Sequence, residues 1–257
     1  MLRIVTSEIR KLNEVMKLVN MVNPHEAYLF TDMEKLCFGA IDPSHVILSY
    51  FHLNDTNYYE LKGKTDRKIL VPNLKGISSI FDKCKRGHVL LLNYDKSNLD
   101  LTILKENDHT ILLNTSFKVE HGSDLYDFPH MKDLIQLNLD IPKLTEELGF
   151  QFLLCEDFRL KIENDDLVFV GETKKISNLE ETRSPIHVTP SLKGLRRMDC
   201  NMDIYLNMDF LRVIHRTLKI SETGNIRIDQ DLPVIFEFEL RNKQGHVKYL
   251  ISPKVNK

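Results

Sequence analysis

The chain comprises 257 residues and has a formal net charge of −2. This length allows one large or two ordinary domains with a full core, and the charge excludes a uniformly basic surface like that of nucleic-acid-binding domains with a pI above about 9. The four cysteines are widely scattered without metal-ligand spacing, which favours a reducing compartment. No apolar run reaches the roughly 20 residues of a membrane helix, so we expect a soluble protein that contacts no membrane.

The first part of the chain predicts a unit of one strand, one helix and three strands, which then repeats. An extended start at residues 3–5 precedes apolar residues at helical spacing from Ile9 to Val19, with Ser7 as N-cap. Extended runs follow at 26–31, 35–41 and 45–53. The second cycle predicts a strand at 68–71, a helix over 72–84, and strands at 88–94, 99–105 and 109–117. The βαβββ unit therefore occurs twice, and such repetition is stronger evidence than any single element.

Residues 118–133 break this pattern and predict a connector between a domain at 1–117 and a domain at 134–257. The cycle then resumes with a strand at 135–141, a helix from Pro142, and strands at 158–163, 167–172 and 174–181. Residues 150–155 fit either a helix or a strand. A strand at 201–206, a helix at 208–217 with Phe210 facing inward, a strand at 225–228 and a hairpin at 232–252 complete the fourth cycle. We expect an α+β fold of two similar domains, each with two helices and two antiparallel sheets.

Three stretches resemble the DNA sliding clamps of the proliferating cell nuclear antigen family. They are the terminal hairpin at 231–256, with its Asp-Leu-Pro start, Gly-His turn and Ser-Pro-Lys-Val ending, the segment at 39–46 (GAIDPSHV), and the strand and helix at 70–84. The first helix matches as well, including its basic residues, whereas residues 114–199 match mainly by the order of elements. The resemblance covers the full length of the chain.

This resemblance implies the DNA clamp fold: a ring of three identical chains with helices lining a central hole and antiparallel sheets outside. Such a ring encircles double-stranded DNA regardless of its sequence and acts as a processivity factor for a DNA polymerase. It also docks a clamp loader and other replication and repair proteins that carry a short peptide motif. No cofactor, metal or catalytic residue is implied.

The resemblance also places basic side chains at the hole, where diffuse attraction to phosphates permits sliding. These residues are Arg10, Lys11, Lys17, Lys75, Lys83, Arg212 and Arg216. The alternative for the first helix is an ordinary solvated face. The chain departs from the family at Ser79 and Asp82 of the second helix and at Glu146 and Glu147 of the third, positions that are usually basic. We therefore expect a thinner phosphate-facing charge, supplemented by neighbouring subunits or by Lys143 and residues 193–197.

Two further surfaces are implied by the resemblance. A pocket for partner peptides would be lined by Ile41, Leu125, Tyr126, Phe128, Pro233, Leu250, Ser252 and Pro253. Alternatively, the connector residues of that set only pin their own loop. A subunit seam would pair the strand at 109–117 with the strand at 174–181 of the next chain, edge to edge, through His109, Ile111, Leu113, Lys175, Ile176 and Leu179.

Two other functions remain open at this point. The acidic third helix suggests a subunit of a heterotrimeric or DNA-damage checkpoint clamp, and scattered Asp and His residues suggest a hydrolase or nuclease. The ten histidines lack HxH and HxxxH spacing, and the chain contains neither GxxxxGK[ST] nor GxGxxG. We therefore expect a non-enzymatic protein, located in the nucleus of a eukaryote or in the cytoplasm otherwise, with a viral origin also compatible.

Overall fold

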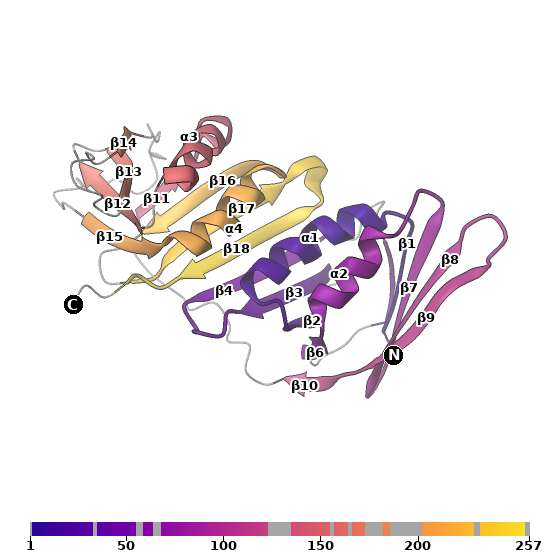
Figure 1. Ribbon diagram of the computed structural model, residues 1–257. Coiled ribbons are helices and arrows are strands. Elements are labelled where there is room, and N and C mark those ends of the chain that lie inside the picture. Colours follow the sequence, from indigo (N-terminus) through magenta and orange to yellow (C-terminus); the bar gives the residue numbers. More distant parts are fainter. Residues whose placement is uncertain are drawn as a thin grey trace. The chain divides into compact units, whose positions relative to one another are not determined.

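The computed structural model describes ten segments of the chain and divides it into two compact units (Figure 1). The described residues are 2–32, 35–54, 59–63, 68–122, 135–154, 157–163, 166–172, 182–185, 202–228 and 232–254. The first unit comprises Met1–Pro43 and Ser49–Asp127, and the second comprises Ser44–Leu48 and Phe128–Lys257. The predicted connector is described only as far as Gly122, and the predicted domain limits stay a prediction.

The first unit contains the two predicted βαβββ cycles together with two short additional strands. Its elements are β1 (Leu2–Thr6), α1 (Ile9–Val22), β2 (Glu26–Asp32), β3 (Lys35–Ile41), β4 (Ile47–Leu53), β5 (Glu60–Lys62), β6 (Lys68–Pro72), α2 (Leu74–Asp82), β7 (His88–Asp95), β8 (Asn98–Lys105), β9 (Ile111–Lys118) and β10 (Glu120–Gly122). One sheet has the order β5-β1-β7-β8-β9, and in the other β10, β6, β2, β3 and β4 are neighbours in this order. In the first sheet all neighbouring strands pair antiparallel, and in the second β10 with β6, β6 with β2, and β2 with β3 do so.

The core of the first unit follows from two residue periodicities. In β8, Leu99, Leu101 and Ile103 are buried at alternate positions, as expected for a strand with one solvated face. In α1, the buried residues include Ile9, Leu12, Val15, Met16 and Val19, whose helical spacing gives one apolar face. The helices α1 and α2 contact each other and lie side by side (Figure 1).

Both helix starts differ from the prediction. The N-cap of α1 is Glu8 rather than Ser7, without a side-chain cap bond, and Glu8 N–H donates instead to Thr6 Oγ1 at 2.9 Å. Pro72 ends β6, and α2 begins after Asn73, whose Oδ1 accepts a hydrogen bond from Gly76 N–H at 3.2 Å. An asparagine tolerates the left-handed φ of 55° found here and still supplies the capping oxygen.

The second unit repeats the same order of elements. They are β11 (Ile135–Asn138), α3 (Ile141–Leu154), β12 (Asp157–Glu163), β13 (Asp166–Glu172), β14 (Thr182–Pro185), β15 (Met202–Asn207), α4 (Met208–Leu218), β16 (Ser221–Ile228), β17 (Val234–Leu240), a 3-10 turn at Arg241–Lys243 and β18 (Gly245–Ile251). One antiparallel sheet has the order β14-β13-β12-β15, and in the other β18, β17, β16 and β11 are neighbours. The α+β class and the mainly antiparallel sheets are confirmed.

Several details of the second unit correct the prediction. The ambiguous segment at 150–154 is helical, and β16 begins at Ser221, four residues before the predicted start. Phe210 is only half-buried, whereas Leu211, Val213 and Ile214 are buried in the same helix. The short strand β14 was not predicted. The predicted strand at 174–181 lies outside the described residues.

The closing hairpin of β17 and β18 packs its apolar side against the helices. Phe236, Phe238, Val247 and Tyr249 on this side are buried. The Tyr249 hydroxyl lies 2.7 Å from Thr217 Oγ1 of α4, and burial raises the pKa of Tyr249. Of the four cysteines, Cys37 and Cys84 are buried, as expected for small core residues. No helix in the described segments combines the length and apolarity that a membrane span requires.

Candidate nucleic-acid interface

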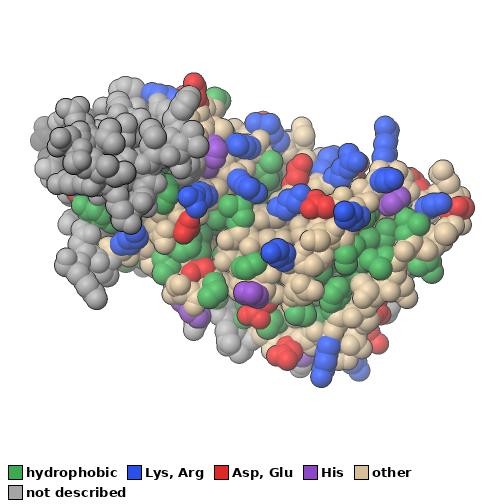
Figure 2. Space-filling view, in the orientation of Figure 1, with side chains coloured by type: hydrophobic (Ala, Val, Ile, Leu, Met, Phe, Trp, Pro, Cys, Tyr) green, Lys and Arg blue, Asp and Glu red, His purple; other side chains and the backbone are tan. Residues whose placement is uncertain are grey.

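The two helices of the first unit present five of the seven cations predicted to face DNA. Arg10 and Lys17 lie on the exposed side of α1, and Lys75 and Lys83 are exposed on α2 and at its C-cap. Lys11 is half-buried at the edge of the same side of α1. Figure 2 shows Lys and Arg side chains over the helices of the first unit, with Asp and Glu side chains between them.

In the second unit, both predicted cations lie exposed on α4. Arg212 and Arg216 are one helical turn apart and therefore share a side of this helix. His215 between them adds no charge at neutral pH, because burial and the nearby cations Lys219 and Arg216 lower its pKa, although its Nε2–H donates to Thr145 O at 3.1 Å. The positive charge on this side of α4 therefore comes from its arginines and from Lys219, which is exposed at its C-cap.

Three of the seven cations are already paired with acids. Lys11 Nζ lies 3.4 Å from Glu8 Oε2, and Arg212 Nη1 lies 2.8 Å from Asp209 Oδ1. The third pair joins two helices, with Lys17 Nζ at 2.6 Å from Asp82 Oδ1. Within the described part of the chain, the other four cations, Arg10, Lys75, Lys83 and Arg216, form no ion pair. These four are the cations most available to phosphates.

Asp82 and Glu146, the acidic residues at positions where basic ones were expected, differ in their surroundings. Asp82 ends α2 and contacts α1, whereas Glu146 is exposed on α3. Lys143, which we expected to compensate for the acidic third helix, is half-buried and has an interaction of its own. Residues 193–197 lie outside the described segments. The thin positive charge expected from the sequence is thus reduced further by pairing.

The predicted seam strand is an exposed sheet edge. Strand β9 is last in the order β5-β1-β7-β8-β9 and pairs with β8. Its Ile111 and Leu112 are 61% and 44% exposed, the large apolar side chains most open to solvent in the described segments. His109 is not part of this strand, because it lies in the preceding turn with a φ of 55° and donates its N–H to Lys105 O. Lys175, Ile176 and Leu179 lie outside the described residues.

The residues predicted to line a partner pocket are described only in part. Pro233 precedes β17, Leu250 ends the outward side of β18, and Ser252 and Pro253 follow, all of them half-buried. Ser252 N–H donates to Val46 O at 2.8 Å, which holds the end of the hairpin in place. In the first unit, Ile41 is half-buried at the end of β3. Leu125, Tyr126 and Phe128 lie outside the described residues.

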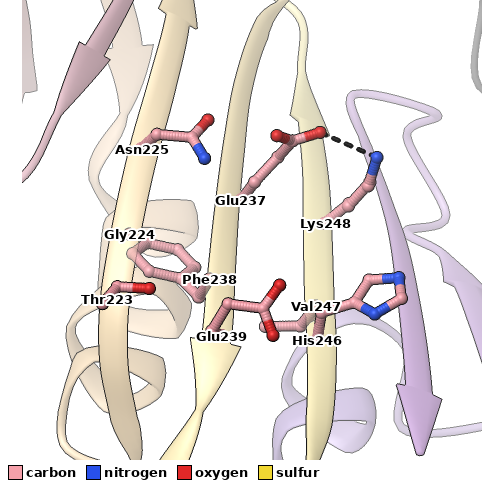
Figure 3. Close-up of a pocket in the computed structure, with 9 residues that line it drawn as sticks. All are labelled: Thr223, Gly224, Asn225, Glu237, Phe238, Glu239, His246, Val247 and Lys248. Carbon is pink, nitrogen blue, oxygen red and sulfur yellow. Dashed lines mark ion pairs between the residues drawn. The ribbon is translucent and has the colours of Figure 1, made fainter. Parts of the chain in front are cut away.

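The outward side of the closing sheet holds a polar pocket that our sequence analysis did not predict. It has a volume of about 220 Å³ and lies over β16, β17 and β18 (Figure 3). The side chains of Thr223, Asn225, Glu237, Glu239, His246 and Lys248 surround it. On the opposite, inner side of β16, Gly224 leaves room for the buried Phe238 ring, since a Cβ would lie 2.6 Å from it. The alternation of side chains along each strand could have shown that these residues point to the same side of the sheet. Only the register between β16, β17 and β18 brings them together.

Glu237 forms the charged centre of this surface. Its carboxylate accepts from Lys248 Nζ at 2.8 Å, shown dashed in Figure 3, and from Arg227 Nη2 at 2.8 Å. Burial alone would raise the pKa of Glu237, but the hydrogen bonds and charges of Lys248 and Arg227 outweigh it and lower this pKa below the ordinary value of 4.5. The ionised carboxylate is thus the form that stabilises the sheet.

We expect Glu237→Gln to lower the free energy of unfolding at neutral pH by about 1–2 kcal/mol, because two charge-assisted hydrogen bonds weaken. A carboxylate whose pKa is lower in the folded chain than in the unfolded chain stabilises the fold at pH values above the unfolded-state pKa. This stabilisation is lost as the pH falls through the folded-state pKa. The difference between variant and unaltered protein should therefore shrink below about pH 4.5. Urea unfolding followed by circular dichroism at neutral and acidic pH measures it. Glu222→Gln, at an exposed position of β16, is the control, and an equal loss in that variant would contradict the assignment.

No His, Cys, Asp and Glu side chains gather in threes as metal ligands within the segments that the structure describes. The charged groups that the helices offer to a ligand in these segments are their cations and the acidic partners of these cations. Such groups can attract phosphates without selecting bases.

Comparison with known proteins identifies distant relatives along nearly the whole chain. The chain is 19% identical over 233 residues to the DNA polymerase sliding clamp of Halobacterium salinarum, covering 90% of each protein. It is 22% identical over 231 residues to that of Methanothermobacter thermautotrophicus, covering 90% of this chain and 88% of the relative. The Haloarcula marismortui clamp is 20% identical over 236 residues. No protein-family model matches the chain. Because the alignments cover 90% of the chain, the similarity includes both units.

Proposed function

We propose that this chain is a subunit of a DNA sliding clamp, a ring that encircles duplex DNA and tethers a DNA polymerase to it. The similarity to archaeal DNA polymerase sliding clamps over 90% of the chain carries this proposal. The described structure supports it, because an α+β fold with two repeated units and exposed cations on α1, α2 and α4 suits such a ring.

The small number of unpaired cations is consistent with sliding. Each lysine or arginine that neutralises a phosphate releases counterions and adds to the affinity regardless of base sequence. A protein that must move along DNA while staying attached needs a weak electrostatic attraction, and a closed ring supplies the attachment. No bond-breaking chemistry is needed, so we propose a non-enzymatic role.

The ring requires that chains associate, and β9 offers a suitable edge. Its outer backbone groups have no strand partner in the described segments, and its exposed Ile111 and Leu112 would be buried by another chain. We propose a homotrimer, in which each β9 pairs with the strand predicted at 174–181 of the next chain. Partner proteins would dock at the end of the closing hairpin around Pro233, Leu250, Ser252 and Pro253, with Ile41 and the connector residues.

A topological retention experiment tests the proposal without knowledge of the loader or polymerase. Protein is mixed at low salt with duplex DNA that is fixed to a bead by one end, and the free end is then closed with a bulky block. We expect protein to survive a high-salt wash on blocked DNA and to be lost from unblocked DNA, because only a ring is held by topology. Equal loss from both would contradict the encircling role.

Light scattering and primer extension on circular DNA, with a clamp loader and polymerase, complete the test. A stable assembly of this chain alone supports the homotrimer, and a monomer that joins related chains favours a heterotrimeric or checkpoint clamp. Longer extension products support a processivity factor. Hydrolysis of the DNA that a single carboxylate substitution abolishes would instead support a nuclease.

A further inference from the structure

The ion pair between Lys17 and Asp82 differs from the other ion pairs that involve the predicted DNA-facing cations. Lys11–Glu8 and Arg212–Asp209 each join residues three apart in or beside one helix. Lys17 and Asp82 belong to different helices, and their side chains are 46% and 50% exposed. An exposed pair adds little to stability, but it determines how much positive charge α1 presents to a ligand.

A buried polar chain holds Asp82 in position. Asn13 Nδ2 donates to Asp82 Oδ1 at 2.8 Å, the oxygen that also accepts from Lys17 Nζ. At its other end, Asn13 Oδ1 accepts from Ser78 Oγ at 2.7 Å. Asn13 and Ser78 are only 4% and 5% exposed between α1 and α2. The Asn13 amide therefore uses its Nδ2 to bind Asp82 and its Oδ1 to bind Ser78. These two hydrogen bonds fix the Asp82 carboxylate relative to α1 and α2.

The charge of Asp82 persists throughout the neutral range. The hydrogen bond from Lys17 lowers the pKa of Asp82 most, burial opposes it, and the charges of Lys17 and Lys83 and the hydrogen bond from Asn13 lower it further. The ionised carboxylate, which accepts from Lys17 and Asn13, is therefore the form favoured at neutral pH.

We propose that Asp82 limits the affinity of the helical face for DNA by holding Lys17 away from phosphates. This rests on the proposed clamp function and adds a regulatory residue to it. An ionised Asp82 removes one of the cations on α1 and also repels phosphates. The hydrogen bonds of Asn13 to Asp82 and Ser78 hold the carboxylate within reach of Lys17, and this pairing keeps the attraction weak enough for movement along DNA.

The test is equilibrium binding of a labelled duplex by Asp82→Asn at several salt concentrations, measured by fluorescence anisotropy. The variant keeps the side-chain shape and an oxygen that accepts from Asn13. We expect affinity to rise on the order of tenfold at about 50 mM salt, and the slope of log affinity against log salt to steepen by about 0.9 for each chain. Asp95→Asn, which removes an exposed carboxylate at the end of β7, is the matched control and should change neither.

The same substitution in a chain that also carries Lys17→Gln separates two effects of Asp82, its pairing with Lys17 and its own repulsion of phosphates. If Asp82 acts through Lys17, most of the increase should disappear when Asp82→Asn is combined with Lys17→Gln. An equal increase in both backgrounds would overturn the role of Lys17, and no increase in either would overturn the proposal while leaving DNA binding intact. If the unaltered chain shows no salt-dependent binding at all, both the clamp function and this inference fail. Unchanged thermal unfolding shows that each variant is folded.

Discussion

Ile111→Asp combined with Leu112→Asp is expected to convert the assembled protein into monomers. Both side chains are exposed in the single chain, so their replacement leaves its core intact. In an edge-to-edge seam they would be buried, and losing about 1.5–3 kcal/mol of burial for each weakens association by about 10² to 10⁴-fold. Light scattering should show a mass of 30.0 kDa for the variant and three times that mass for the unaltered protein.

The matched control for the seam is Asn242→Asp with Lys243→Asn. It changes the net charge by the same two units at exposed positions of the turn before β18. This control should remain assembled. An assembled Ile111/Leu112 variant with native circular dichroism would show that β9 is not the seam, and the clamp ring would then need another edge.

Arg10→Glu, Lys75→Glu and Arg216→Glu together are expected to weaken the binding of duplex DNA strongly. These three cations are exposed on α1, α2 and α4 and form no ion pair in the described segments. Loss of three phosphate contacts per chain should weaken binding by about 10³-fold at roughly 50 mM salt and flatten the salt dependence by about 2.7. The anisotropy titration used for Asp82→Asn measures both quantities.

A control variant with the same change in net charge shows whether the position of the cations on the helices matters for DNA binding. Lys96→Glu, Lys105→Glu and Lys243→Glu alter exposed cations in the turns or at the ends of strands rather than on helices. This variant should bind DNA much better than the helix variant, although its net charge is identical. Equal loss in both variants would mean that the overall charge, and not the position of the cations on the helices, attracts DNA.

The sequence by itself determined the order of elements and the fold class. Residues such as Ile9, Leu12 and Val19 recur at helical spacing, and Phe236 and Phe238 alternate, so that local periodicity indicates which side of each element is buried. These patterns can be read from the sequence because they depend only on residues that are close along the chain. The two repeats of βαβββ in each half then restrict the fold to two similar α+β domains. Element ends were less predictable, because capping at Asn73 and Glu8 depends on local backbone geometry.

The tertiary structure alone decided which of the predicted functional residues are available. Lys17 and Asp82 are 65 residues apart in the sequence, and only the packing of α1 on α2 makes them partners. The same packing joins the buried Asn13 to Ser78, a partner 65 residues away that no periodicity indicates. Likewise, cross-strand register gathers Glu237, Lys248 and Arg227. The pairing of charges depends on distances between residues remote in sequence, and those distances exist only once the chain is folded.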